Sequence, residues 1–232
     1  MISEFIRLWL SERTFFRELM AQIVIHLSRR DRLLKKMKIY LIRHGQTIGD
    51  VEDRYGGAYD DELTDEGKAQ AQGLADKLSD SGIQILFCSP LKRAQQTAEI
   101  LNAKLDCEIK TVHNLRERNK NGVLTGMTKS EAKIKYPELV EKLKDYRSQI
   151  EGAESQDDFA ERIKRAFIEI ISSANYSTIG IVTHGMPFWV IFGDILNDNG
   201  IVKIADCAYA VLNKEDQKLN VEKLDGIEHK TD

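Results

Sequence analysis

In residues 41–47 the chain reads Leu41-Ile42-Arg43-His44-Gly45-Gln46-Thr47, directly after an apolar run that begins at Met37. The apolar, β-branched residues from Lys38 to Ile42 predict a strand. An arginine, a histidine and a glycine follow it at once. An imidazole in this place can act as a nucleophile, and the guanidinium beside it can hold an anion. The stretch therefore predicts a strand of an α/β sheet and, at the end of that strand, the centre of a site.

The composition is that of one globular domain, or of one domain with a small appendage. The chain has 232 residues, and 42% of them are hydrophobic, which is enough to bury one sizeable core. Its net charge is −3, but residues 1–38 contain nine Lys/Arg and four Asp/Glu, so the remainder is acidic. An acidic domain argues against nucleic acid as the natural ligand, because duplex binding needs a concentrated basic face.

The cysteines give no sign of a covalent or metal-bound framework. Cys88, Cys107 and Cys207 are odd in number and widely spaced. No CxxC pair and no Cys/His cluster with the spacing of a zinc site accompanies them. We therefore expect three small buried apolar residues, no disulfide and no metal. A cytoplasmic location, in a reducing compartment, is the simplest expectation.

Residues 1–36 are expected to form an N-terminal extension separate from the main domain. Apolar residues between Phe5 and Leu27 recur three to four apart among arginines, which predicts a basic amphipathic helix. The longest uncharged run, Leu19 to Ser28, is shorter than the roughly 20 residues that cross a bilayer. Three interpretations stay open. The segment binds a membrane surface or a partner protein, it packs on the domain as a plain appendage, or translation starts at Met37 and the segment is absent from the native protein.

The main domain, residues 37–232, alternates between predicted strands and helices. Strands are expected at 38–42, 83–88, 107–112, 178–183, 208–212 and 219–224. Helices are expected at 64–79, 90–101, 128–146 with an interruption at Pro137, 156–173 and 187–196, and residues 50–62 are expected to form a loop. This order predicts an α/β fold, a three-layer α/β/α sandwich with a mostly parallel central sheet.

Residues with useful chemistry follow several of these strands. His44 follows the first strand, Ser89-Pro90 the second, and His184 the strand that ends at Thr183, while Glu117 lies beyond the third. In open α/β sheets, ligands bind outside the carboxyl ends of the strands. These residues, far apart in sequence, should therefore converge on one edge of the sheet.

The converging groups match the needs of phosphoryl transfer, which requires an in-line nucleophile, cations around the phosphoryl oxygens and a proton for the leaving oxygen. His44 is the candidate nucleophile and would form a phosphohistidine. Arg43, Arg93 and His184 would bind the phosphoryl oxygens. Glu117 would protonate the leaving alkoxide and then deprotonate the attacking water. The flanking arginines should keep His44 neutral near pH 7, and with arginines neutralising the charge neither a metal nor a cofactor is needed.

Four segments in this order resemble those of the histidine phosphatase superfamily, also called the phosphoglycerate mutase-like proteins. They are residues 41–47, Ser89-Pro90-Leu91-Lys92-Arg93-Ala94, Leu115-Arg116-Glu117 and Val182-Thr183-His184-Gly185. The resemblance covers roughly residues 37–215 and implies a phosphoglycerate mutase-like fold. It implies a phosphohistidine at His44, a phosphate pocket of Arg43, Arg93 and His184, and a proton donor at Glu117. It further implies substrate contacts from Gly45, Gln46, Thr47, Asp50, Gly56, Gly57 and Gly185.

The chain departs from this family in two places. Many members carry asparagine where this chain has Asp50, and an aspartate would repel a phosphate dianion unless it is paired or turned away. Arg54 is the nearest candidate partner in the sequence. The arginine-rich insertion of the cofactor-dependent mutases also has no clear counterpart after Glu117. The sequence thus favours a metal-independent phosphatase of a small phosphorylated metabolite, similar to the broad-specificity or α-ribazole phosphatase branch.

Two alternatives stay open, a cofactor-dependent phosphoglycerate mutase and a non-catalytic binding module on the same fold. Trp189 is interpreted as a packing residue, and the oligomeric state is not readable. Several basic residues either line the mouth of the site, where they would favour an anionic leaving group, or form solvated faces. These are Lys120, Lys129, Lys133, Lys135 and Arg147.

Overall fold

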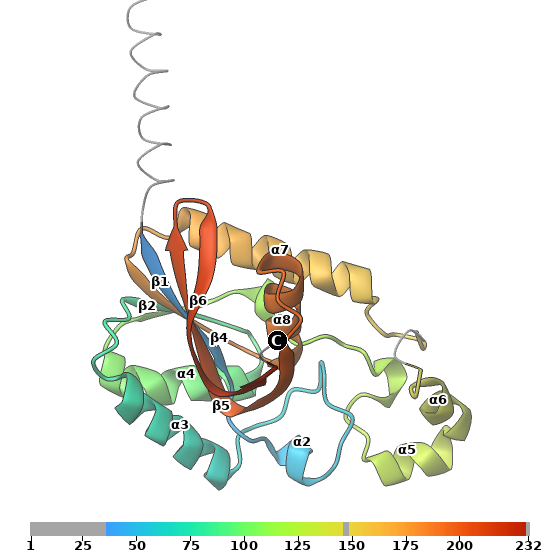
Figure 1. The fold of residues 1–232 in the computed structure, drawn as a ribbon. Helices are drawn as coiled ribbons and strands as arrows, with labels where there is room; N and C mark the ends of the chain where they lie inside the picture. The colour runs from blue at the N-terminus through green and yellow to red at the C-terminus, as the bar shows by residue number, and fades with distance from the viewer. Residues whose placement is uncertain (1–35, 146–148, 231–232) are drawn as a thin grey trace, which may run out of the picture.

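The computed structural model describes residues 36–145 and 149–230, which are built on one six-stranded sheet of order β3-β2-β4-β1-β5-β6 (Figure 1). The strands are β1 (Met37–Arg43), β2 (Ile85–Cys88), β3 (Glu108–Thr111), β4 (Thr178–Thr183), β5 (Ile201–Glu215) and β6 (Lys218–His229). The first four strands run parallel, and β5 and β6 add an antiparallel hairpin beside β1. The predicted α/β sandwich with a mostly parallel sheet is confirmed. The predicted helix of the N-terminal extension falls outside the described residues.

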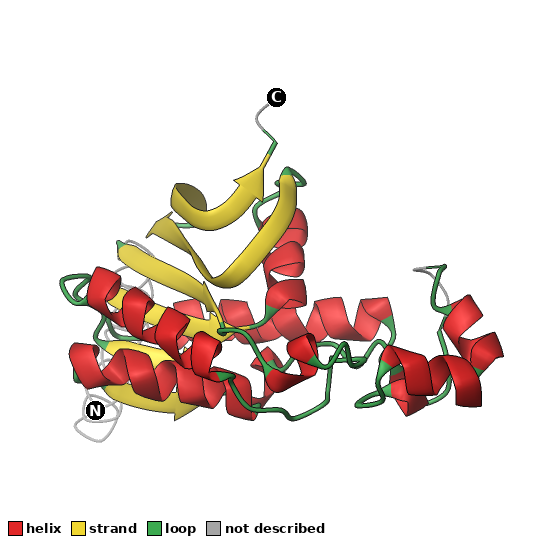
Figure 2. Cartoon of the chain, turned by 90° about the horizontal axis from the view of Figure 1, so that it is seen from below, coloured by secondary structure: helices red, strands yellow, loops and turns green. Residues whose placement is uncertain are grey.

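Helices cover both faces of the sheet (Figure 2). They are α2 (Ile48–Val51), α3 (Asp65–Leu78), α4 (Lys92–Leu105), α5 (Lys129–Lys135), α6 (Pro137–Lys142), α7 (Gln156–Ser173) and α8 (Gly185–Val190), which a π-helical turn, Ile191–Ile195, continues. Helices α3 and α4 pack on one face, and α7 and α8 pack on the other. Helices α5 and α6 stand to one side of the sandwich and pack over a small apolar cluster of their own (Figure 1).

The central strand β1 shows why both faces are covered. Successive side chains of a strand point to opposite faces. Ile39 and Leu41 belong to the core under α7 and α8, whereas Tyr40 and Ile42 belong to the core under α3 and α4. A strand that is apolar on both sides must be buried on both sides, which places β1 in the middle of the sandwich.

The helix starts follow the capping residues that the sequence offers. The Thr64 hydroxyl accepts a hydrogen bond from the Gly67 N–H (2.9 Å) at the start of α3. The Ser155 hydroxyl accepts one from the Asp158 N–H (3.0 Å) at the start of α7. Such caps satisfy N–H groups that have no partner within the helix.

Several boundaries differ from those predicted. Residues 48–51, expected partly as loop, form the short helix α2, because Thr47 and Asp50 form a capping box at its start, in which each side chain accepts from the backbone N–H of the other. Helix α4 begins at Lys92, two residues after the predicted start. Strands β5 and β6 are much longer than predicted, and shifts in their register interrupt the simple alternation of buried and exposed residues.

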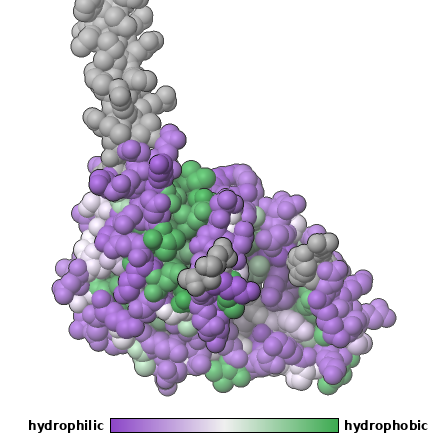
Figure 3. All heavy atoms as spheres, viewed as in Figure 1, coloured by the Kyte–Doolittle hydropathy of each residue, from purple (hydrophilic) through white to green (hydrophobic). Residues whose placement is uncertain are grey.

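The outer surface of the molecule is mostly hydrophilic, and on the face shown in Figure 3 apolar groups gather over the β5–β6 hairpin. Val202 and Val221 are among the exposed large hydrophobic residues of these two strands. Within residues 36–145 and 149–230, no helix has the length and apolar character needed to span a bilayer.

Candidate active site

The ends of three parallel strands, β1, β2 and β4, bring His44, Ser89 and His184 together at one edge of the sheet. The His44 N–H donates to the Thr183 carbonyl (3.1 Å), and the Cys207 N–H donates to the His44 carbonyl (3.1 Å). The backbone of His44 is therefore held by neighbouring strands on both sides. The predicted convergence on this edge is present in the structure.

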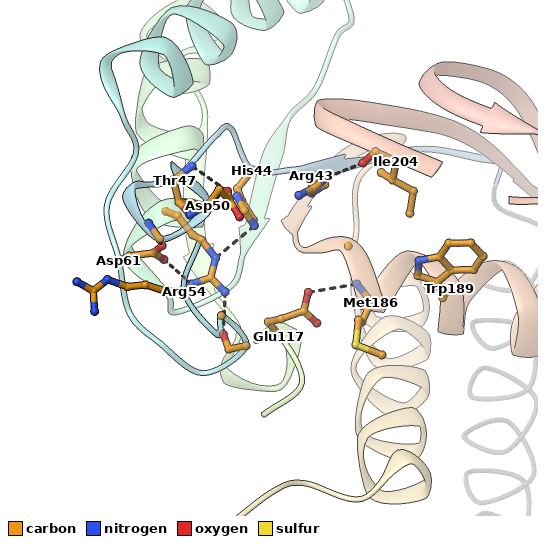
Figure 4. A pocket seen from close by; sticks show the side chains of 15 residues that line it. Arg43, His44, Thr47, Asp50, Arg54, Asp61, Glu117, Met186, Trp189 and Ile204 are labelled. Atoms are coloured by element: carbon orange, nitrogen blue, oxygen red, sulfur yellow. Dashed lines mark hydrogen bonds and ion pairs between the residues drawn. The ribbon is translucent and has the colours of Figure 1, made fainter. Parts of the chain in front are cut away.

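A pocket of about 280 Å³ opens at this edge (Figure 4). Its lining is polar and carries both charges, with three arginines facing three carboxylates. It consists of Arg43, His44, Thr47, Gly49, Asp50, Arg54, Gly56, Gly57, Asp61, Arg93, Glu117, Gly185, Met186, Trp189 and Ile204. The size suits a phosphoryl group and the first atoms of a small leaving group.

The His44 ring is oriented by hydrogen bonds at both nitrogens. Nδ1 lies 2.7 Å from the Gly45 carbonyl oxygen, which can only accept, so Nδ1 carries the proton. Nε2 then presents its lone pair and accepts from Arg93 Nε at 3.2 Å. Burial lowers the pKa of His44 well below its usual range, and the charges of Arg93 and Arg43 lower it further. The ring is thus neutral near pH 7, with burial as a larger cause than the arginines named from the sequence.

Arg93 joins the two histidines of the site. Its single Nε–H lies 3.2 Å from His44 Nε2 and 3.2 Å from His184 Nδ1. The two rings meet edge to face, with their centroids 5.0 Å apart. This arrangement puts a permanent positive charge beside both imidazoles in a buried place, where an arriving anion would be strongly attracted.

The rest of the Arg93 guanidinium is fixed by oxygen atoms of the loop between α2 and α3. Nη1 donates to the Tyr59 carbonyl (2.6 Å) and to Asp61 Oδ1 (2.9 Å), and Nη2 donates to the Gly57 carbonyl (2.9 Å). Asp61 also accepts from the Gly49 N–H (3.0 Å) through its other oxygen. The side chains of Arg93 and Asp61 are only 5% and 7% exposed, so this is a buried ion pair. It sets the direction of the guanidinium before any ligand arrives.

His184 lies behind Arg93, fully buried, and does not itself line the pocket. Its Nε2 is 2.6 Å from the Ser89 hydroxyl. Burial lowers its pKa well below the usual range, and the charge of Arg93 adds to this effect. Because Nδ1 accepts from Arg93, Nε2 carries the proton and donates to Ser89 Oγ.

Arg43, the last residue of β1, is held from the other side of the pocket (Figure 4). Nη1 donates to the Ile204 carbonyl, and Nη2 pairs with Asp206 at 3.1 Å. Its Nε is buried and has no hydrogen-bond partner among the described residues. A buried N–H without a partner is costly, so an anion in the pocket would find a donor ready to bind it.

Glu117 enters the pocket opposite His44, with its carboxylate near Met186 in Figure 4. One oxygen accepts from the Arg118 N–H (2.8 Å), and the other accepts from the Met186 N–H (3.2 Å) at the start of α8. Burial raises the pKa of Glu117 above its usual range, although both N–H groups and the nearby arginines oppose the rise. Because of this raised pKa, a larger fraction of Glu117 is protonated near neutral pH than of a glutamate with the usual pKa.

The structure corrects the predicted partner of Asp50. Its carboxylate accepts from the Thr47 N–H (3.0 Å) and hydroxyl (2.9 Å), and the Asp50 N–H donates to the Thr47 hydroxyl oxygen (3.2 Å), so the two residues cap the start of α2. Arg54, the partner suggested by the sequence, instead pairs with Glu52 and donates to the Gly126 carbonyl (2.7 Å). Asp50 lines the pocket, but its lone pairs are directed partly to Thr47.

Two of the predicted substrate-binding residues support the site from behind. Gly45 and Gln46 are not among the residues that line the pocket. A Cβ on Gly45 would lie 2.5 Å from the Gly67 carbonyl oxygen, and a Cβ on Gly67 would lie 2.1 Å from the Gln46 carbonyl oxygen. Helix α3 therefore touches the loop that follows His44, and only glycine allows this approach. The Gln46 N–H also donates to Gln70 of α3 (3.0 Å).

Several lining residues were not found from the sequence. Asp61 meets the pocket from the loop between α2 and α3, and Ile204 meets it from β5 next to a shift in register, and neither position has a periodic signal. Met186 was quoted in no motif, although it stands two residues after His184. Trp189 was interpreted as a packing residue, which is wrong, because it is 44% exposed and lines the pocket.

Comparison with known proteins points to one family. The sequence profile of the histidine phosphatase superfamily (branch 1) matches residues 39–225. The chain is 35% identical over 153 residues to phosphoglycerate mutase-like protein 4 of Arabidopsis thaliana, covering 64% of this chain and 66% of that one. It is 29% identical over 196 residues to phosphoserine phosphatase 1 of Hydrogenobacter thermophilus, covering 81% and 92%.

A solved structure shares the fold at lower identity. The alpha-ribazole phosphatase from Shigella flexneri superposes with a TM-score of 0.71 at 21% identity, covering 84% of this chain and all of the other. The central sheet and its covering helices are thus those of a known architecture.

Proposed function

The chain belongs to the histidine phosphatase superfamily, and from this premise we propose that it is a metal-independent phosphatase of a small phosphorylated metabolite. One observation carries the proposal: His44 Nε2 has its lone pair free of a proton and lies 3.2 Å from Arg93 Nε. Arg43 and Glu117 line the same pocket. Relatives named as phosphatases support a phosphatase activity within this family.

In the first step His44 Nε2 attacks the phosphorus atom. The P–N bond forms as the P–O bond to the alcohol breaks, and the protonated Glu117 gives its proton to the leaving oxygen. Arg93 Nε and the unpartnered Arg43 Nε bind the phosphoryl oxygens. The products of this step are the free alcohol, a phosphohistidine at His44 and a Glu117 carboxylate.

In the second step water attacks the phosphohistidine. The Glu117 carboxylate takes a proton from the water, the new P–O bond forms, and the P–N bond breaks. Inorganic phosphate leaves, and Glu117 is protonated again. The raised pKa of Glu117 suits both directions of this transfer, because the acid form is needed first and is restored at the end.

His184 acts through Arg93 and Ser89. The neutral ring has one proton, and in the ligand-free arrangement that proton faces the Ser89 hydroxyl. Its Nδ1 accepts from Arg93 Nε, so His184 helps to hold the guanidinium in the direction from which it meets the phosphoryl group.

The experiment that tests this proposal combines trapping with one substitution. The protein is mixed with a phosphomonoester labelled in its phosphate, quenched in base, and assayed for label on His44. We expect the wild type to be labelled and His44→Ala to lose turnover by at least about 10³-fold, because loss of the nucleophile removes the covalent route. His113→Ala, which changes an exposed histidine, is the control. Turnover by the wild type without any labelled histidine contradicts the proposal.

A mutase is the second candidate function, favoured by the 35% identity to a protein named as phosphoglycerate mutase-like. A mutase returns the phosphoryl group to the organic product, whereas a phosphatase releases inorganic phosphate. Incubation with 3-phosphoglycerate, with and without 2,3-bisphosphoglycerate, separates the two. Efficient isomerisation without release of phosphate favours the mutase and rejects the phosphatase.

A further inference from the structure

Glu117 lies in the stretch between β3 and α5, just after a single 3-10 turn. Backbone in such a stretch has no regular ladder of hydrogen bonds, so other groups must hold its carbonyls. The N–H groups of Arg118 and Met186 orient the Glu117 carboxylate, but they fix its position only if the backbone stays in place. One anchor comes from β4, where the Thr183 hydroxyl donates to the Leu115 carbonyl (2.8 Å).

A second anchor comes from Arg162, which lies on α7, the helix that covers the sheet behind this stretch. Its Nη1 donates to the Asn114 carbonyl (2.8 Å) and to the Arg116 carbonyl (2.9 Å). A single nitrogen therefore bridges the carbonyls on both sides of Leu115. The second of these carbonyls belongs to the peptide bond that leads into Glu117, so Arg162 holds the backbone directly before the proposed proton donor.

The other side of the Arg162 guanidinium is held by Glu154. Nε donates to Glu154 Oε1 (2.8 Å), and Nη2 donates to Glu154 Oε2 (2.7 Å). The two side chains are only 9% and 17% exposed. Two parallel bonds between a planar guanidinium and a carboxylate fix the plane of both groups. The N–H of Glu154 also donates to the Asn119 carbonyl (2.8 Å), so the same unit holds the chain on both sides of Glu117.

A neighbouring arginine of the same helix shows that these contacts are particular to Arg162. Arg165, about one turn further along α7, is 69% exposed and pairs with Glu161 of its own helix at 3.4 Å. It offers a matched comparison, because the two arginines differ in what they hold and not in the element that carries them.

We propose that Arg162 is a positioning residue for Glu117, and that with Glu154 it fixes the place from which the Glu117 carboxyl reaches the leaving oxygen. This inference rests on the proposed phosphatase function. Arg162 is not among the residues that line the catalytic pocket, so it acts through Glu117 and not on the substrate. Proton transfer needs the donor within hydrogen-bond reach of the leaving oxygen, and a small displacement of the donor lowers the rate strongly.

The test compares two phosphomonoesters that differ in their need for a proton, with the full-length protein. The alkoxide of propyl phosphate needs a proton as it leaves, whereas p-nitrophenolate leaves readily without one. Arg162→Lys keeps the charge, but one ammonium group cannot replace the planar fork that holds two carbonyls and a carboxylate. We expect kcat/KM to fall by about tenfold or more for propyl phosphate and by less than about twofold for p-nitrophenyl phosphate.

Two further variants accompany this one, and thermal unfolding shows that each is folded at the assay temperature. Arg165→Lys is the control and should change kcat/KM for either ester by less than about twofold. Glu154→Gln approaches the same unit from its other side, because an amide has one acceptor oxygen for the two Arg162 nitrogens. We expect it to lower kcat/KM selectively for propyl phosphate by about threefold or more, and it decides the test if Arg162→Lys does not fold.

A double variant shows whether the effect passes through Glu117. With the acid already removed in Glu117→Gln, the further change Arg162→Lys should cause no additional selective loss for propyl phosphate. A selective loss of the same size in both backgrounds means that Arg162 acts on another group, and it overturns the inference.

The remaining outcomes separate this inference from the proposed function. Equal losses for the two esters in the folded variants, or no loss for either ester, overturn the positioning role and leave the phosphatase intact. If Glu117→Gln itself slows both esters equally, the acid role of Glu117 fails and this inference fails with it, while labelling of His44 still reports the nucleophile. If the wild type hydrolyses neither ester, the phosphatase proposal fails, and the positioning role fails with it.

Discussion

The substitution Asp61→Asn tests whether the position of Arg93 depends on an ion pair inside the protein. Asp61 uses both of its oxygens, one for Arg93 Nη1 (2.9 Å) and one for the Gly49 N–H (3.0 Å). An asparagine of the same shape offers one acceptor and one NH₂ group. The NH₂ group must then face either the guanidinium or the Gly49 N–H, and both are donors.

The size of the effect follows from burial. The two side chains of the pair are 5% and 7% exposed, so water does not compensate the lost charge. Removing one partner of a buried ion pair costs about 3–5 kcal/mol, and because asparagine keeps one acceptor we expect about 3 kcal/mol. For a domain of this size, about 3 kcal/mol corresponds to a fall in Tm of roughly 6–12 °C.

Thermal and urea unfolding measure this loss, and steady-state kinetics measure its effect on the site. With Arg93 less firmly held, kcat/KM for a phosphomonoester should fall by about tenfold or more, because positioning contributes directly to the barrier. Asp60→Asn is the matched control. Asp60 is exposed and accepts one hydrogen bond, from the Lys92 N–H, so its substitution should cost less than about 1 kcal/mol.

A double variant measures whether Asp61 and Arg93 depend on each other. If Asp61 acts mainly by compensating Arg93, then Asp61→Asn combined with Arg93→Met should be less destabilised than the sum of the two single changes. A loss of stability below about 1 kcal/mol in Asp61→Asn, or strict additivity in the double variant, would refute the role given to this ion pair.

Three further predictions concern the same site. Gly67→Ala should destabilise the protein and lower kcat/KM, because the new Cβ would lie 2.1 Å from the Gln46 carbonyl oxygen. Gly73→Ala is the control on the same helix, and because it has open space around it, it should stabilise the protein by about 0.5–1 kcal/mol. Equal changes in the free energy of unfolding for the two variants, measured in urea, would contradict the close contact. Glu117→Gln should slow hydrolysis of alkyl phosphates by about 10²-fold and of p-nitrophenyl phosphate far less, and an equal loss removes the acid role. Because folding lowers the pKa values of His44 and His184, these two side chains bind protons at a higher pH in the unfolded protein than in the folded one. The unfolding free energy should therefore not depend on these histidines above about pH 6.5. As the pH is lowered from there, it should decrease by about 1.4 kcal/mol per pH unit for each histidine. An unfolding free energy that stays constant over this range in denaturant titrations would contradict this.

The sequence predicted the centre of the sheet because β1, β2 and β4 are short, strongly apolar runs, whereas the edge strand β3 is mostly exposed. Such runs are buried on both faces and need no partner to be recognised. The same reasoning placed His44 and His184 at one edge, since the carboxyl ends of parallel strands meet there. Strand β6 was underestimated because most of its side chains are exposed, which removes the alternating pattern on which the prediction depends.

The parts of the site that were missed depend on contacts between elements that are far apart in the sequence. Asp61 reaches Arg93 across 32 residues, and Asp206 reaches Arg43 across a disturbed register of β5. Neither contact leaves a periodic trace in the chain. The role of Gly45 was likewise hidden, because its need for a small residue comes from Gly67, which belongs to another element.

The backbone bonds of His44 have a consequence for how the reaction proceeds. Its N–H and its carbonyl are bonded to Thr183 at the end of β4 and to Cys207 of β5, so the residue is anchored directly after a strand that is paired on both sides. In an in-line displacement either the acceptor or the migrating atom has to travel. In the mechanism that we propose, the acceptor is His44, so phosphorus itself would cover the path and leave its alcohol behind.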